Sequence, residues 1–312
     1  MLLERISEET GLSPSYIAKL GRMANHQYKL YTIAKKRGVG RRPIAHPSRK
    51  LKFLQRWIVG ALIDTLPIHE AAAAYQPGSS VRKNAEQHVR NNFLLKLDFK
   101  DFFPSITDTD VVAHLKRHDG ELRMQLSETE RRFVASVVTR LGHMPIGAPS
   151  SPVLSNQIMH SFDSAVSDFC QGLRVAFTRY ADDLFFSTNE PNVLGDVHRR
   201  VQALLTELPY PKLRLNTAKT VYTSRRRRRL VTGLVLTSDK KISIGRSSKR
   251  YIKSLIHRFK LNELSAEERE YLTGYLAYIG SVDPLFLGAL KMKYGGETIS
   301  DAGNVLATNP DG

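Results

Sequence analysis

Three aspartates lie where the sequence makes a carboxylate costly to bury. Asp98 follows the segment LLKL, and Asp182 and Asp183 lie between YA and LFF. Two adjacent carboxylates repel each other, so a half-buried pair needs a cation, and a divalent ion such as Mg²⁺ binds both carboxylate oxygens and substrate phosphates. An Asp-Asp pair alone is more often only the polar tip of a hairpin. The surrounding motifs favour the metal site.

Three segments surround these aspartates in a fixed order. They read LDFKDFFPSI at 97–106, GAPSSPVLSN at 147–156 and YADD at 180–183. In this order they resemble motifs A, B and C of reverse transcriptases, and a chance occurrence of all three is negligible. The resemblance implies an RNA-directed DNA polymerase, a nucleotidyltransferase in which Asp98 and Asp182 hold two metal ions.

The resemblance assigns roles to further residues near the aspartates. It implies that Asp183 completes the site, that the Phe99 backbone carbonyl adds an oxygen, and that two Mg²⁺ ions bind, with Mn²⁺ as a substitute. Such ions activate the attacking hydroxyl and stabilise the leaving pyrophosphate. Phe103 matches the bulky gate that excludes a ribose 2′-hydroxyl, and a core aromatic is the alternative reading of the same residue.

Basic residues match positions that handle the incoming nucleotide. Arg42 resembles the finger arginine that contacts the triphosphate, with Lys36 and Arg41 as weaker candidates. Gly147 opens the second motif and is assigned to the same nucleotide site. Lys219, in LNTAKT, matches the motif D lysine that could protonate the departing pyrophosphate. Each basic side chain alone would more often be a solvated surface charge.

One position departs from the family pattern. Reverse transcriptases usually have Pro-Gln-Gly before the second motif, and this chain has Ile146 in place of the Gln. An aliphatic side chain forms no amide hydrogen bonds, so any base or sugar contact of that Gln is absent. The departure concerns nucleotide contacts and fidelity and leaves the reaction class unchanged.

Two further strings narrow the resemblance to retron reverse transcriptases. Residues 84–88 read NAEQH, which matches NAxxH, and residues 231–233 read VTG. Retron membership implies a cognate structured non-coding RNA as template, a 2′-hydroxyl primer, a branched RNA–DNA product (msDNA), and a role in anti-phage defence. It also implies a separate effector protein and a host RNase H for template removal. Group II intron or diversity-generating reverse transcriptases, and a catalytically silent RNA-binding scaffold, are the alternatives.

The charge of the chain favours a polyanionic partner. Lys and Arg total 47 and Asp and Glu total 30, which gives a formal charge of +17. Such an excess favours nucleic acid or an anionic membrane. No apolar run reaches membrane-spanning length and the N-terminus lacks the pattern of a signal peptide, so we expect no membrane partner. These features and the single Cys170 indicate a cytoplasmic protein.

Two basic segments and the NAxxH string are expected to bind the RNA. The arginines at 225–229 are either a solvated run or phosphate contacts. The segment 246–260 alternates cations with apolar residues at helical spacing, as in a thumb helix that faces a duplex. The residues expected to contact RNA are Asn84, His88, Arg225, Arg226, Arg227, Arg228, Arg229, Lys249, Arg250 and Lys253.

The elements that must position these residues alternate irregularly between helix and strand. We expect short helices through residue 34, a basic hairpin at 35–50, helices at about 51–66, 108–141 and 191–208, and a loop that becomes helical within 147–170. We expect strands at 93–99, near 219–224 and at 231–236, a hairpin at 174–188, three helical segments over 246–293, and a frayed tail.

This pattern predicts an α+β protein with a mainly antiparallel sheet. The resemblance implies a right-hand polymerase fold. Its N-terminal helical cap and fingers would span 1–95, its palm 96–236 with remaining fingers elements around 110–155, and its short helical thumb and C-terminal tail 237–312.

Overall fold

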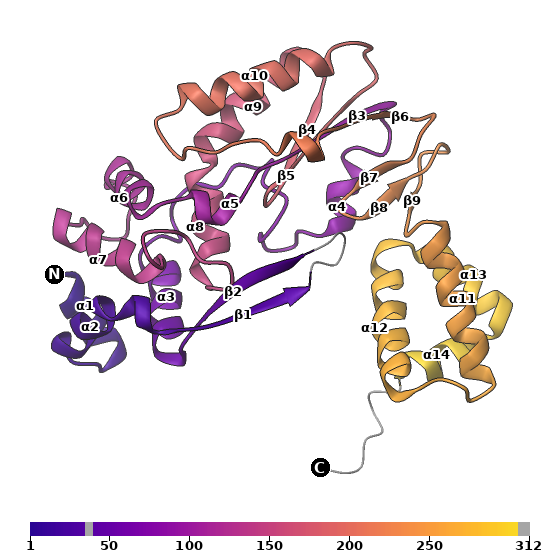
Figure 1. Ribbon diagram of the computed structural model, residues 1–312, viewed down its shortest axis with the longest axis horizontal. Helices are drawn as coiled ribbons and strands as arrows, with labels where there is room; N and C mark the ends of the chain where they lie inside the picture. Colours follow the sequence, from indigo (N-terminus) through magenta and orange to yellow (C-terminus); the bar gives the residue numbers. More distant parts are fainter. Residues whose placement is uncertain (35–39, 305–312) are drawn as a thin grey trace.

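The three aspartates lie on a four-stranded antiparallel sheet. In sheet order its strands are β4 (Ala176–Tyr180), β5 (Asp183–Thr188), β3 (Phe93–Asp98) and β6 (Val221–Ser224). The structure is a computed structural model that describes residues 1–34 and 40–304 (Figure 1). The strands predicted at 93–99 and near 219–224 and the hairpin predicted at 174–188 are confirmed.

The sheet separates two hydrophobic cores because alternate side chains on a strand point to opposite faces. On β5, Leu184 and Phe186 enter the larger core, whereas Phe185 enters the second core together with Leu94 of β3. Both faces of the sheet are therefore covered. This is why β5 reads as a continuous apolar run rather than an alternating one.

Helices cover one face of the sheet and complete the larger core. Helix α9 (His160–Gly172) packs on β4, and α10 (Leu194–Glu207) packs on α9 and β5 (Figure 1). The remaining helices and short helical turns of this part are α1 (Leu2–Thr10), α2 (Pro14–Arg22), η1 (Ala24–His26), α3 (Arg49–Ala61), α5 (Phe102–Ser105), α6 (Asp108–Arg117), α7 (Glu128–Val138), α8 (Ser150–Ile158) and η2 (Thr217–Lys219).

A two-stranded hairpin projects from this body. Strand β1 (Tyr28–Ala34) pairs with β2 (Arg41–Pro47), and the two strands stand away from the four-stranded sheet in Figure 1. The prediction of helices through residue 34 is wrong for 28–34, because this segment finds a strand partner in β2. Lys36 lies outside the described residues.

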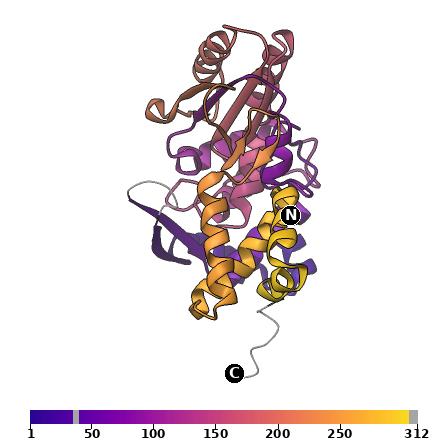
Figure 2. The same cartoon turned by 90° about the vertical axis from the view of Figure 1, so that its right-hand side faces the viewer.

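The C-terminal part begins with a small sheet and continues as helices. Strands β7 (Arg229–Val231), β8 (Leu234–Leu236) and β9 (Ile242–Ser243) pair in that order, and α4 (Val81–Glu86) packs against them. Figure 2 shows the C-terminal helices gathered beyond this small sheet. They are α11 (Arg246–Lys260), α12 (Ala266–Val282), α13 (Pro284–Tyr294) and α14 (Gly296–Asn304).

The expectation of a frayed tail is wrong for residues 296–304. Helix α14 packs on α12 and α13, and it buries Ile299 and Ala302 in the second core. No helix among the described residues combines the length and apolar character needed to cross a bilayer.

Candidate active site

Strand register brings the aspartates to one end of the sheet. Asp98 is the last residue of β3 and lies opposite Asp183, the first residue of β5. Ala181 and Asp182 form the turn from β4 to β5, where Ala181 adopts a φ of 55°. The backbone N–H of Phe99 donates to the carbonyl oxygen of Asp182 at 2.9 Å, which ties the end of β3 to this turn.

Burial and mutual repulsion disfavour the charged form of two of these carboxylates. Burial raises the pKa of Asp183 to about 6, with Asp182 and Asp98 adding to the effect and Lys96 opposing it. Burial also raises the pKa of Asp182, the charge of Asp98 adds to this, and Lys219 and Arg42 oppose it. A group that stabilises the charged carboxylates of Asp182 and Asp183 would therefore be favoured at this site.

Two lysines pair directly with the aspartates. The Lys219 ammonium donates to both Asp98 carboxylate oxygens at 2.8 and 2.9 Å, and Lys96 Nζ lies 2.6 Å from Asp183 Oδ1. Partial burial lowers the pKa of Lys219, but the three aspartates outweigh this and raise it overall. In this arrangement no three His, Cys, Asp or Glu side chains within 1–34 and 40–304 converge as a ready metal site.

Phe103 lies beside an aromatic residue that sequence analysis missed. Its ring centroid is 6.5 Å from that of Tyr75, which is 46% exposed and adopts a left-handed φ of 63°. Burial raises the pKa of Tyr75, and the charge of Asp182 adds to this, so the phenol is close to the aspartates. The only sequence signal at Tyr75 was the turn-forming QPG that follows it.

A buried ion pair lies behind the β4–β5 turn that carries Asp182. Arg179 and Asp163 are both fully buried, and the guanidinium donates two hydrogen bonds to the carboxylate at 2.8 and 2.6 Å. Its remaining nitrogen, Nη1, donates to Asn156 Oδ1 at 3.1 Å and to the Ala181 carbonyl at 3.4 Å. Arg179 thus links α8 and α9 to the turn that carries Asp182. Arg179 has no local sequence signal, because Asn156 and Asp163 are more than a dozen residues away in the chain.

The predicted nucleotide residues divide into two groups. Arg42 is exposed, and its charge acts on Asp182, whereas the Arg41 guanidinium donates to Thr32 across the hairpin. Gly147 adopts a φ of 114°, and a Cβ there would lie 3.0 Å from the Ala45 carbonyl oxygen. Gly147 thus allows β2 to approach closely, which leaves Arg42 as the better placed of the described candidates.

Asn84 and His88 of the NAxxH string were expected to contact RNA, but both side chains are buried. His88 is fully buried, and its ring nitrogens lie 2.7 Å from Ser187 Oγ and 2.8 Å from Thr178 Oγ1. Thr178 in turn donates to Asn84 Oδ1 at 2.5 Å, and Asn84 is also buried. Neither side chain can reach RNA directly. These hydrogen bonds fasten the end of α4 to the sheet through the His88 ring and Asn84 Oδ1.

The expected RNA contact is also wrong for Arg229, the last residue of the arginine run at 225–229. Arg229 is 1% exposed and donates to the carbonyl oxygens of Asn91 and Thr237, so it cannot bind RNA. The arginines at 225–228 are exposed in the connection between β6 and β7. Of the five arginines, only these four are exposed, as an RNA-binding surface requires.

The predicted cations of α11 differ in the same way. The Lys249 ammonium lies 2.8 Å from Asp283 and over the ring of Phe286, so its charge is directed to the protein. Lys253 lies 5.8 Å from the same ring, although it is exposed, and Arg250 is exposed. Arg250 and Lys253 therefore stay candidates, and Lys249 is the weaker one.

Comparison with known proteins agrees with this geometry. The model of the family described as reverse transcriptase (RNA-dependent DNA polymerase) matches residues 33–272. The retron Ec83 reverse transcriptase of Escherichia coli is 38% identical over 306 residues, which cover 94% of this chain and 96% of that protein. The retron Ec86 reverse transcriptase of Escherichia coli is 32% identical over 314 residues, which cover 96% and 92%.

The fold has a counterpart among solved structures. A telomerase from Candida albicans, solved with a fragment of telomeric RNA, aligns with a TM-score of 0.50 at 14% identity, over 96% of this chain and 64% of that chain. This likeness concerns the fold, which is the right-hand polymerase fold predicted from the motifs. Since the family match and the retron relatives span most of the chain, this protein belongs to the reverse transcriptases and is an RNA-directed DNA polymerase of the retron type.

Proposed function

We propose that this polymerase copies part of a cognate structured non-coding RNA into DNA, starts from a 2′-hydroxyl of that RNA, and yields branched RNA–DNA (msDNA). Its substrates are dNTPs, and its RNA and DNA product stay bound to the basic surface. A separate effector protein would act with this complex in anti-phage defence, and a host RNase H would remove the copied template. The similarity to retron enzymes over almost the whole chain supports this proposal.

The residues fit a pair of Mg²⁺ ions. Asp98, Asp182 and Asp183 offer the hard carboxylate oxygens that Mg²⁺ prefers, and a divalent ion would stabilise the charged forms of Asp182 and Asp183, whose pKa values are raised by burial and by the neighbouring aspartates. The Phe99 carbonyl is the proposed additional oxygen. When bound, the ions would activate the primer hydroxyl and stabilise the leaving pyrophosphate. Mn²⁺ offers similar chemistry.

The protein's own groups would position the reactants and move the proton. Arg42 would contact the triphosphate, and Phe103 beside Tyr75 would form the wall against which the sugar lies. Lys219, released from Asp98, would donate its proton to the departing pyrophosphate. The buried Arg179 keeps Asp182 in place through its hydrogen bond to the turn. Together these groups supply orientation and electrostatic stabilisation, which dominate catalysis of phosphoryl and nucleotidyl transfer.

The observation that carries the proposal is the tie between motif A and motif C, in which Asp98 lies opposite Asp183 and Phe99 donates to Asp182. The test is to purify the protein from its host and sequence the co-purifying nucleic acid. We expect one RNA species covalently joined to DNA through a 2′ linkage, and its loss in Asp182→Asn. The matched control Asp239→Asn, an exposed acid, should retain it. DNA without a branch, or product in Asp182→Asn, would contradict the proposal.

A further inference from the structure

Strand β3 contains a lysine that has no part in the mechanism proposed above. Lys96 lies between Leu95 and Leu97, which are both fully buried in the larger core, and its own side chain is 28% exposed. A strand that is covered on both faces normally reads as an apolar run, and a cation within it gives up part of its hydration. The position of Lys96 therefore requires a compensating partner or a function.

The side chain of Lys96 lies on the face of the sheet that carries two of the catalytic aspartates. Alternate residues of a strand share a face, so Lys96 and Asp98 point to the same side of β3. The register places Asp183 opposite Asp98, and Phe185 and Val221 on either side of Lys96. Two residues of strand span about 7 Å, so a long side chain at this position reaches the edge of the catalytic site.

The ammonium of Lys96 has hydrogen-bonding capacity to spare. Nζ lies 2.6 Å from Asp183 Oδ1 and 5.5 Å from the centre of the Phe185 ring. An ammonium has three N–H donors, and within residues 1–34 and 40–304 Asp183 is its only ionic partner. Both side chains of the pair are in contact with solvent, and such pairs contribute little to stability. Two donors therefore remain for a bound substrate.

The other cations of the site indicate which substrate this is. Arg42 and Lys219 are the cations proposed for the triphosphate and the departing pyrophosphate. The charge of Arg42 acts on Asp182, whereas Lys96 pairs with Asp183. In an in-line displacement the attacking hydroxyl and the leaving group lie on opposite sides of the phosphorus. With two cations on the side of the leaving group, Lys96 is available for the strand that carries the attacking hydroxyl.

We propose that Lys96 contacts the last phosphodiester of the primer strand and thereby positions the attacking hydroxyl at the catalytic site, while Asp183 holds the ammonium in place. The proposal rests on the polymerase activity and on the roles proposed for Arg42 and Lys219. It does not depend on the branched product or the defence role. A contact with one backbone phosphate fixes the position of the strand and is independent of base sequence.

The test uses the full-length protein, an RNA template and three DNA primers. One primer has the natural backbone, one has an uncharged methylphosphonate at its last linkage, and one has the methylphosphonate well upstream, out of reach of Lys96. The affinity of each protein for each primed template is measured without dNTP at several salt concentrations. The KM for dNTP is measured on the natural primer.

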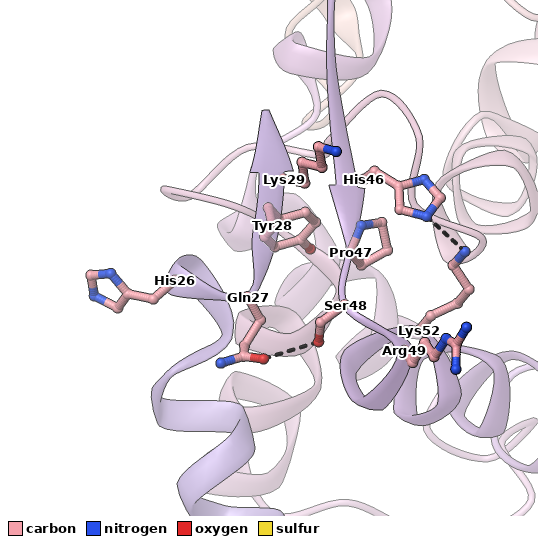
Figure 3. A pocket seen from close by; sticks show the side chains of 9 residues that line it. All are labelled: His26, Gln27, Tyr28, Lys29, His46, Pro47, Ser48, Arg49 and Lys52. Atoms are coloured by element: carbon pink, nitrogen blue, oxygen red, sulfur yellow. Dashed lines mark hydrogen bonds between the residues drawn. The ribbon is translucent and has the colours of Figure 1, made fainter. Parts of the chain in front are cut away.

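Three variants complete the experiment. Lys96→Gln removes the cation, and Lys96→Arg keeps it. The matched control Lys52→Gln removes another half-buried lysine, whose Nζ lies 3.0 Å from His46 Nε2 in a cavity at the base of the β1–β2 hairpin (Figure 3). None of the residues assigned to catalysis or nucleotide binding lines that cavity.

We expect the terminal methylphosphonate to weaken binding about 10-fold for the wild-type protein and Lys96→Arg, because a hydrogen bond between two charged groups is lost. Lys96→Gln should bind the natural primer more weakly, with a log–log salt slope lower by about 0.7–0.9, and should be insensitive to the terminal modification. Lys52→Gln should respond to this modification as the wild-type protein does. The upstream modification should affect all four proteins alike, and the KM for dNTP should stay unchanged.

A wild-type protein that is insensitive to the terminal methylphosphonate would overturn the proposal, and this result needs no variant to fold. Equal sensitivity of the wild-type protein and Lys96→Gln would also overturn it, and would make Lys96 only a partner of Asp183. A raised KM for dNTP in Lys96→Gln with unchanged primer affinity would overturn it in favour of a contact with the incoming nucleotide. Because the primer is DNA and the template is not the cognate RNA, failure of the branched synthesis would leave these results unaffected.

Discussion

Lys219 holds Asp98 through both carboxylate oxygens, at 2.8 and 2.9 Å from its ammonium nitrogen. These are the oxygens that a metal ion would need, so the ion pair and metal binding exclude each other. We therefore propose two roles for Lys219. It would compensate the charge of Asp98 before the ions bind, and it would be released beside the reacting phosphates afterwards.

Replacing Lys219 should separate these two roles. In Lys219→Gln the Mg²⁺ concentration for half-maximal activity should fall several-fold, because the ion no longer competes with an ammonium. kcat should fall by about 100-fold, because the proton donor is lost. Single-nucleotide incorporation measured across a Mg²⁺ series checks both. Lys212→Gln, an exposed lysine nearby, should change neither. A higher Mg²⁺ requirement in Lys219→Gln would contradict the competition.

Shrinking Phe103 should open the sugar site. In Phe103→Ala the efficiency of rNTP incorporation relative to dNTP should rise by about 10- to 100-fold, since the side chain would no longer meet the 2′-hydroxyl. The two efficiencies are measured by single-nucleotide extension of the same primed template. Phe53→Ala, which alters an exposed phenylalanine, serves as the control. A lower thermal midpoint with an unchanged ratio would show that Phe103 acts only as a core aromatic.

The arginine run should behave as two kinds of residue. Replacing Arg225, Arg226 and Arg227 by Gln should weaken RNA binding and lower the log–log salt slope by about 2. Arg229→Gln should leave the slope unchanged but reduce the free energy of unfolding by about 1.5–3 kcal/mol, because two buried carbonyl oxygens lose a charged donor. Salt-dependent binding and urea unfolding measure the two effects. Equal effects of both variants on the slope would contradict this division.

Acid should destabilise the protein through two buried histidines. Burial lowers the pKa of His88 to about 3 and that of His114 also to about 3, with the charges of His118, Arg117 and His160 adding to the effect at His114. Between about pH 6.5 and that value the unfolded chain binds a proton at each site and the folded protein does not. Stability is therefore complete above about pH 6.5 and is lost as the pH falls.

The expected loss is about 2 kcal/mol per histidine from about pH 6.5 to about pH 5. In His114→Leu one of the two contributions should disappear, and this variant loses no hydrogen bond at Nε2, which has no partner in the structure. Urea unfolding at both pH values measures the difference. His26→Leu, at an exposed position, should keep the full pH dependence. An unchanged dependence in His114→Leu would contradict the assignment.

Much of the site was predictable because strand alternation and the three motifs are local in the sequence. The positions of Asp98 and Asp182 and the β4–β5 hairpin follow from such local patterns. The burial of a side chain cannot be predicted from local patterns, since it depends on partners far along the chain. For this reason the motif around His88 led to an expected RNA contact that the burial of His88 contradicts.

Dependence on partners far along the chain also explains why β1 and α14 were not predicted from the sequence. The strand at 28–34 exists because of its pairing with β2, and α14 is helical and buried because it packs on α12 and α13. Arg179 looked like one more basic residue beside YADD, and only the fold shows that Asp163 and Asn156 surround it.

The fully buried pair of Arg179 and Asp163 also restricts which amino-acid substitutions the chain tolerates at these two positions. Loss of either partner alone leaves an uncompensated buried charge, at a cost of about 3–5 kcal/mol, which is a large share of the roughly 5–15 kcal/mol that holds a protein folded. A single substitution at either position is therefore strongly destabilising. Simultaneous replacement of both residues by apolar residues of similar volume is far less costly. A chain that replaces both residues must also find another donor for the Ala181 carbonyl.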